Sequence, residues 1–212
     1  GTLMVNNLAG SGTGAGSVSI NGTSVLAGSG IIAPAAGSSI SIGANATLSV
    51  GSPTDVAGQA FRFNLQATNT VNIAGTIALQ LFDNITASNP NSEADRLIFS
   101  GAGAGSINIL GGASLSLSTV SPLVSTSFNV GDSWQLFDWG AASVNGKFTG
   151  LDPALQQYVT IAGVPLGAGL SWDISQLYTL GSIVVAVPEP SRMILLLLGL
   201  LTLGVRRRRR TE

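Results

Sequence analysis

Four stretches of the sequence repeat one spacing of apolar and small residues, and this pattern constrains the fold more than any other feature. They read VSINGTSVL from Val18, ISIGANATLSV from Ile40, VNIAGTIALQL from Val71 and INILGGASLSL from Ile107. Each stretch has β-branched residues at offsets 0 and 2, Gly or Ala at offset 4 and Leu at offset 8, and the last three add Val or Leu at offset 10. The positions are Val18, Ile20, Gly22, Leu26; Ile40, Ile42, Ala44, Leu48, Val50; Val71, Ile73, Gly75, Leu79, Leu81; Ile107, Ile109, Gly111, Leu115, Leu117.

Apolar residues at every second position, on both sides of a small residue, predict two short strands that meet at a corner. The stretches begin 22, 31 and 36 residues apart, which suits solenoid coils with inserted loops. One strand pair cannot bury its own apolar face, so neighbouring pairs must stack. We therefore expect an all-β fold, an elongated β-solenoid of the parallel β-helix type, with Ile42, Ile73 and Ile109 buried. Because the period is irregular, a β-sandwich built from the same hairpins is the alternative.

The aromatic content changes at Phe128, where a second kind of segment begins. Trp134 and Trp139 lie shortly after it, and Trp172 lies in a later apolar stretch that leads to the tail. A solenoid needs a terminal cap, because an open end exposes apolar surface and unpaired strand edges. We expect a repetitive solenoid at 1–127, a capping β region at 128–186 and a separate tail at 187–212. The functional alternative for the tryptophans is sugar stacking.

The tail combines an apolar run with a cluster of arginines. Residues 193–205 carry no charge, and five arginines follow directly. Pro188 and Pro190 block a helix before Ser191, which is a good N-cap, so a single short hydrophobic helix is expected to begin at Arg192. The arginines would hold their end in the cytoplasm and leave the body outside. A buried C-terminal core helix is the alternative. The topology signal is Arg206, Arg207, Arg208, Arg209 and Arg210.

The order of motif, hydrophobic helix and arginine cluster resembles the PEP-CTERM sorting signal of Gram-negative bacteria. The resemblance implies export, recognition of the motif by an exosortase, and removal of the helix and arginines at or near it. The precursor would be anchored in the cytoplasmic membrane, and the body would then be released or attached to the cell surface or exopolysaccharide. The apolar run is at the short end for the family. The motif residues are Val187, Pro188, Glu189, Pro190 and Ser191.

The repeats resemble a second family feature, the autotransporter-associated β-strand repeats of secreted bacterial proteins. GTLMVNN, NATLSVG and ADRLIFSG carry this resemblance, which covers roughly residues 1–120 and implies an elongated β-helix. The first residues show neither a basic n-region nor an apolar h-region. Since the proposed orientation requires export, we expect a signal peptide, and further repeats, upstream of residue 1.

Few residues offer chemistry. The chain has no Cys and no His, so thiol nucleophiles, the commonest general base and most zinc sites are excluded. Residues before Val187 carry three basic and eight acidic side chains, a net charge of −5, which argues against nucleic acid as a partner. Asp83, Glu93 and Asp95 offer hard oxygen ligands and are the candidate calcium ligands. The alternative is a solvated turn with Asp95 and Arg96 holding its exit. We expect no catalytic residue and no cofactor.

These features predict an exported, non-enzymatic structural or adhesive protein of the bacterial surface or extracellular matrix. A carbohydrate-binding or polysaccharide-active β-helix module is one alternative. Ice binding is another, since β-solenoids sometimes bind ice through threonine ladders. Thr47, Thr76 and Thr119 do not share one offset of the repeat, which argues against such a ladder.

Overall fold

The protein is described by a computed structural model over residues 1–52, 54–82, 94–103, 105–119, 128–161 and 163–188. This part of the chain consists of strands, turns and loops without any helix, so the predicted all-β class is confirmed. The predicted hydrophobic helix and the arginine cluster lie outside the described residues.

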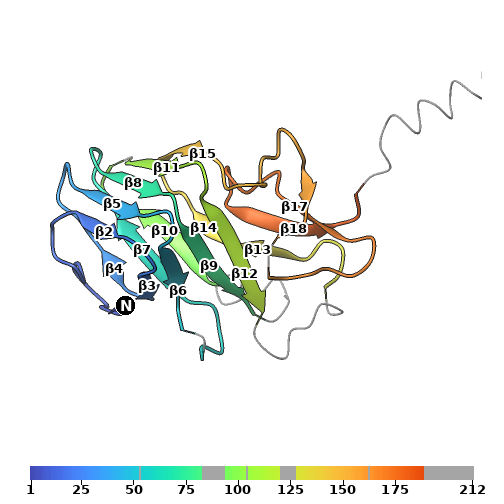
Figure 1. Ribbon diagram of the computed structural model, residues 1–212, viewed down its shortest axis with the longest axis horizontal. Helices are drawn as coiled ribbons and strands as arrows, with labels where there is room; N and C mark the ends of the chain where they lie inside the picture. Colours follow the sequence, from blue (N-terminus) through green and yellow to red (C-terminus); the bar gives the residue numbers. More distant parts are fainter. Residues whose placement is uncertain (53, 83–93, 104, 120–127, 162, 189–212) are drawn as a thin grey trace, which may run out of the picture.

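The strands form four sheets (Figure 1). Sheet A contains β1 (Thr2–Val5), β3 (Val25–Gly28), β6 (Thr47–Val50), β9 (Thr76–Leu81) and β12 (Ser114–Thr119). Sheet B contains β2 (Val18–Ile20), β5 (Ser39–Ile42), β8 (Thr70–Ile73), β11 (Ser106–Ile109) and β15 (Ser143–Gly146). Sheet C contains β4 (Ile31–Ile32), β7 (Ala60–Asn64), β10 (Arg96–Ser100) and β14 (Phe137–Asp138). Sheet D contains β13 (Ser133–Gln135), β16 (Tyr158–Val159), β17 (Ser171–Asp173) and β18 (Ser182–Ala186).

The chain visits sheets B, A and C in a fixed order. It runs from β2 to β3 to β4, then from β5 to β6 to β7, and it repeats this order through β8, β9 and β10. Each strand lies beside the strand of the previous round, and all strand pairs of these three sheets are parallel. The hairpins that a β-sandwich of these segments would need are not found between the described strands of the repeats.

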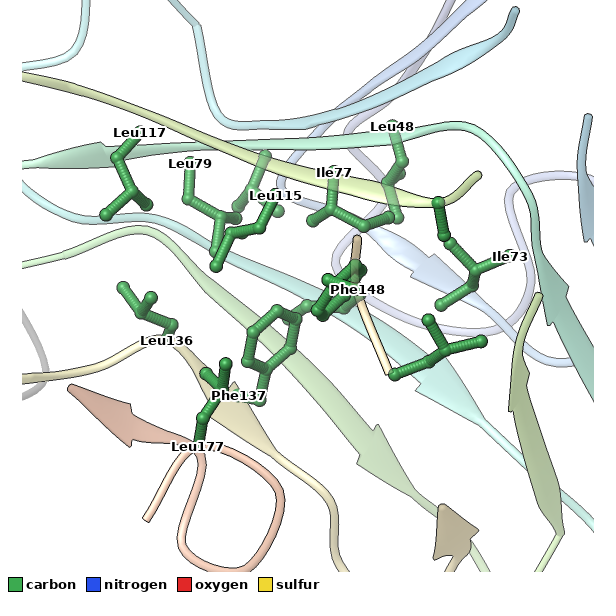
Figure 2. Packing of buried hydrophobic residues seen from close by; sticks show 14 of the residues in the cluster. Leu48, Ile73, Ile77, Leu79, Leu115, Leu117, Leu136, Phe137, Phe148 and Leu177 are labelled. Atoms are coloured by element: carbon green, nitrogen blue, oxygen red, sulfur yellow. The ribbon is translucent and has the colours of Figure 1, made fainter. Parts of the chain in front are cut away.

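The repeated apolar positions point into the space between the sheets. Ile42, Ile73 and Ile109 are 1%, 0% and 4% exposed, which confirms the predicted inward face. Val18 is only partly buried, because its strand lies at the edge of sheet B. Figure 2 shows side chains of sheets A and B, such as Leu48 and Ile73, directed toward the same interior as Phe137. Burial of these rows is the main stabilising contribution expected for such a stack.

One corner differs in length from the others. Two residues separate β8 from β9, whereas four separate β5 from β6. The register therefore pairs Leu48 with Ile77, and not with Leu79 as the shared offset suggested. The difference is two residues, so the alternation of inward and outward side chains is preserved. A Cβ at Gly75, in the short corner, would overlap the carbonyl oxygens of Ala46 and Gly43, which explains the glycine.

A buried asparagine joins the corners of two successive rounds between sheets C and B. Asn69 is 1% exposed. Its amide nitrogen donates to the carbonyl oxygens of Ala35 at 2.7 Å and Ser38 at 2.8 Å. Its side-chain oxygen accepts the N–H of Gln66 at 2.5 Å. These bonds satisfy buried backbone groups that a polar corner would otherwise leave without partners.

Aromatic side chains fill the interior behind sheet C. Phe63 and Phe99 are register partners, with ring centroids 5.6 Å apart. Trp139 continues this row, stacked on Phe99 at 5.4 Å and on Phe137 at 4.5 Å. The row is a ladder of rings on successive strands, and such pairs add to the free energy gained from burial alone.

Sheet D is antiparallel and lies at the end of the stack opposite β1 and β2 (Figure 1). Its core contains Trp134 and Trp172, whose ring centroids lie 5.7 Å apart, and Phe128 packs on both. The carbonyl oxygen of Gly181 accepts the N–H groups of Leu136 at 2.8 Å and Phe137 at 3.1 Å. Sheet D is thereby tied to β14, the last strand of sheet C.

Candidate functional site

Asp95, one of the three calcium candidates, is buried at a corner between sheets A and C. Its carboxylate accepts the N–H of Gln59 at 2.9 Å on one oxygen and the N–H of Gln80 at 3.0 Å on the other. The N–H of Asp95 donates to the carbonyl oxygen of Gln80 at 2.8 Å. The side chain therefore links the end of β9 to the start of β7, in the preceding round. It is 0% exposed, and its two bonds to Gln80 join the ends of the segment between β9 and β10.

The environment of Asp95 disfavours its charge. Burial raises the pKa of the Asp95 carboxyl to about 7, although the N–H groups of Gln59 and Gln80 lower it. The charge of Asp55 raises it further. Both carboxylates face the backbone of Gly51, where a Cβ would lie 2.6 Å from Asp55 Oδ2 and 3.2 Å from Asp95 Oδ1.

The calcium prediction is not tested by this geometry. Asp83 and Glu93 lie outside the described residues. Within the described ranges, no three acidic, His or Cys side chains gather in a way that would hold a metal ion. Both oxygens of Asp95 already accept backbone N–H groups, and Asp55 accepts the N–H of Ser52 at 2.6 Å. The observed role of Asp95 is to join two corners.

The outward face of sheet A carries a row of small hydroxyl and β-branched side chains. Thr47 and Thr76 are register partners, although they have different offsets in the repeat. The short corner before β9 brings them together. Ser114 follows Thr76, and the two hydroxyl oxygens lie 2.9 Å apart. The expectation that the threonines form no ladder is therefore wrong for Thr47 and Thr76. Thr119, in contrast, pairs with Leu81.

The outward face of sheet B carries a ladder of amides. Asn72, Asn108 and Asn145 occupy successive strands in register. The amide of Asn145 donates to Asn108 at 3.2 Å, and the amide of Asn108 donates to Asn72 at 2.9 Å. Asn72 and Asn108 share offset 1 of their repeats, so the repeated pattern contained a signal for two of the three asparagines in this ladder. Asn145 lies outside the four repeated stretches, and no pattern pointed to it.

The three tryptophans are not sugar-stacking platforms. Trp134, Trp139 and Trp172 are 2%, 5% and 0% exposed. The indole N–H of Trp139 donates to the carbonyl oxygen of Leu177 at 2.9 Å within the core. The capping interpretation of these residues fits their burial, whereas stacking on a sugar requires an open ring face.

Two of the three basic side chains before the tail lie against acidic ones. Lys147 Nζ lies 2.7 Å from Asp152, and Arg96 lies 3.9 Å from Asp138. Hydrogen bonding to Lys147 is the main cause that lowers the pKa of the Asp152 carboxyl. These pairs provide no continuous basic surface.

The predicted sorting motif begins directly after β18, the last strand in the described part of the chain. Val187 and Pro188 are exposed and follow β18, which ends at Ala186. Glu189, Pro190, Ser191 and the arginines from Arg206 to Arg210 lie outside the described residues. In the part of the chain that the structure describes, no helix has the length and hydropathy that a membrane crossing requires.

The chain matches no family model, no curated protein and no solved structure.

Proposed function

We propose that this chain is a non-enzymatic structural or adhesive protein of the bacterial surface or extracellular matrix. In this proposal, residues 1–127 form an elongated β-solenoid of the parallel β-helix type, and residues 128–186 cap it, with β14 and β15 added to the edges of sheets C and B. The tail at 187–212 is a PEP-CTERM sorting signal. The observation that carries the proposal is the threefold order of parallel strands, with buried apolar rows inside and uncharged Ser, Thr and Asn rows outside. The outward rows of sheets A and B therefore present hydroxyl and amide groups on successive strands.

The cap is supported by the contacts of sheet D. Solenoid ends must be covered because they expose apolar surface and open strand edges. The carbonyl oxygen of Gly181 accepts two N–H groups at the edge of sheet C, and a Cβ at Gly163 would overlap the carbonyl oxygen of Leu117 in β12. The residues after Gly146 therefore lie against strands of both sheet A and sheet C.

The sorting role is supported by where the motif stands. Val187 and Pro188 are exposed immediately beyond the last strand, so an exosortase could reach the motif without unfolding sheet D. The hydrophobic run would hold the precursor in the membrane, with Arg206 to Arg210 in the cytoplasm. The neutral hydroxyl and amide rows would face the exopolysaccharide or other envelope components.

The test is the C-terminal mass of the protein extracted from the surface of a Gram-negative host with an exosortase. The expected product ends near the motif and lacks the arginines. Replacing Pro188, Glu189 and Pro190 with Ala should stop cleavage and leave the full chain in the membrane fraction. Replacing the exposed Leu155 by Ala is the matched control and should leave cleavage unchanged. A surface product that retains Arg206 to Arg210 would refute the sorting role.

Ice binding is the second candidate, because the register aligns Thr47, Thr76 and Ser114 on a parallel sheet. Strands about 4.8 Å apart place their hydroxyls and methyls in a regular array. Thermal hysteresis of the purified chain measures this activity. Thr76→Lys should abolish it, whereas Asn72→Lys on sheet B should not. No hysteresis in the parent chain removes this candidate.

A further inference from the structure

The tail joins the folded body at β18, a strand that lies inside sheet D and not at its edge. It is flanked by β13 on one side and β17 on the other, and both neighbours are antiparallel to it (Figure 1). The chain passes from Ala186, the last residue of β18, directly to Val187 and the rest of the tail. A pull on the tail therefore acts first on a strand that is paired on both sides.

The strand β18 begins at the stack and runs away from it. Gly181, the residue before β18, accepts the N–H groups of Leu136 and Phe137, where β14 of sheet C begins. A pull on Val187 against the stack thus acts along the axis of β18. Hydrogen bonds between antiparallel strands are perpendicular to the strands, so this pull loads them together, in shear. A pull across the strands would instead break them one after another.

The neighbouring strand β13 continues directly into the stack. Only Leu136 separates Gln135, the last residue of β13, from β14, and β14 pairs with β10 of sheet C. The ladder between β13 and β18 is extended by two further bonds. The N–H of Gly131 donates to the carbonyl oxygen of Val185, and the N–H of Val185 donates to that of Asp132, both at 2.8 Å. The path from the tail to sheet C therefore consists of one ladder and one connecting residue.

The inward side chains of β18 oppose the same sliding movement. Ile183 and Val185 are fully buried. Their register partners are Trp134 on β13 and Trp172 on β17, and the two indole rings lie 5.7 Å apart. A slip of one residue along β18 would turn its buried side chains to the opposite face of the sheet. Movement along the strand therefore disrupts the core of sheet D as well as its hydrogen bonds.

We propose that β18 is a mechanical clamp, which transmits tension from the tail to the stack by shear against β13 and β17. This function rests on the proposed attachment of the protein through its tail, because only an attached protein is pulled at this point. It goes beyond capping, since a cover for the end of the stack does not require a doubly paired strand next to the tail. In contrast, β16 pairs only with β17 among the described strands and lies outside the path.

Single-molecule pulling of the full chain in mild detergent tests the clamp. The chain has no Cys, so two introduced cysteines define the points of attachment. Val187→Cys with Leu110→Cys, directly after β11, loads β18 in shear against the stack. Val187→Cys with Val130→Cys, shortly before β13, holds adjacent ends of the two strands and peels them apart. These three side chains are exposed. At equal force, the lifetime in shear should be at least roughly tenfold longer, because several bonds must break together.

Two matched substitutions in the shear geometry separate a clamp from a cover. Val185→Ala on β18 and Val159→Ala on β16 remove the same atoms from buried positions of one sheet. Val185→Ala should shorten the lifetime under force roughly tenfold, since burial of two methyl groups is lost in the loaded strand. Val159→Ala should shorten it by less than about twofold, because β16 carries none of the tension.

Equal lifetimes in the two pulling geometries would overturn the proposal. Equal effects of the two substitutions would also overturn it and would leave sheet D as a cover only. The measurement uses the purified chain and no exosortase. A failure of sorting would appear in the C-terminal mass and would leave the lifetimes unchanged, so the two proposals fail separately.

Discussion

Asp95→Asn should change how the stability of the protein depends on pH. In the folded state the pKa of Asp95 is raised to about 7, whereas an unfolded Asp titrates near 3.9. Between these two values the folded state holds a proton that the unfolded state has lost. The stability contributed by this group is therefore fully present below about pH 4 and is lost as the pH rises to about 7.

The magnitude follows from the shift. Each pH unit within this window changes the free energy of unfolding by about 1.4 kcal/mol. From pH 5 to pH 8 the parent protein should lose about 3 kcal/mol through Asp95. The chain has no His, and His is the side chain that ordinarily titrates in this range. Among the described carboxyls, Asp95 is the one whose pKa is raised into this range, so its substitution should remove most of the slope.

The Asn variant removes the titration. At pH 5 the Asp95 carboxyl of the folded parent is protonated, so its carbonyl oxygen is the main acceptor, as in the amide, and the two proteins should have similar stabilities. At pH 8 the parent has lost about 3 kcal/mol through Asp95 and the variant has not, so Asp95→Asn should be more stable than the parent by about that amount.

The assay is urea unfolding at several pH values, followed by the fluorescence of the three buried tryptophans and by circular dichroism. Asp152→Asn is the control, since the pKa of this exposed carboxyl is lowered and its titration falls below the window. Parallel stability curves for the parent and Asp95→Asn between pH 5 and pH 8 would refute the reasoning. They would mean that the two N–H donors outweigh burial and keep Asp95 ionised.

Three further substitutions test the interior. Ile73→Asp places an unpaired carboxylate at a position of 0% exposure and should prevent soluble expression, whereas Ser116→Ala on the outward face should be tolerated; equal expression would mean that the two faces are misassigned. Gly75→Ala overlaps backbone and should cost about 1–3 kcal/mol in urea unfolding, while Gly16→Ala meets open space and should cost much less. Asn69→Ala removes three buried hydrogen bonds and should lower the free energy of unfolding by about 2–5 kcal/mol; a loss below 1 kcal/mol would contradict its role at the corners.

The alternation of apolar residues was enough to predict which side chains are buried. Ile73 and Ile109 lie inside because strand side chains alternate strictly, and no loop length changes that parity within a strand. The register between neighbouring strands was harder to predict from the sequence. Leu79 shared an offset with Leu48, yet Ile77 is its partner, because the corner before β9 is two residues shorter. A pattern of fixed offsets takes no account of a change in the length of a corner.

The third sheet had no counterpart in the repeated pattern. Its strands begin after loops of different lengths, and β4 contains only Ile31 and Ile32. The burial of Asp95 was equally hidden, because its carboxylate bonds to Gln59, which lies 36 residues earlier in the chain. Such contacts depend on which rounds become neighbours in the stack. No local feature of the sequence indicates which rounds become neighbours.

The parallel register itself accounts for much of the low charge content. Strands of successive rounds place equivalent side chains about 4.8 Å apart, so a charge that recurred at one repeat position would stack against its own copies. Like charges directly opposite each other are destabilising. The charged residues that lie in strands avoid this: Arg62 pairs with Ile31 and Ile98, Arg96 pairs with Ala60, and Asp138 pairs with Ile98. Serine, threonine and asparagine can recur without this penalty, and Asn72 and Asn108 gain a hydrogen bond by doing so. The in-register stack thus gives a physical reason for few charges in its strands, in keeping with the charge content of 9% in the whole sequence.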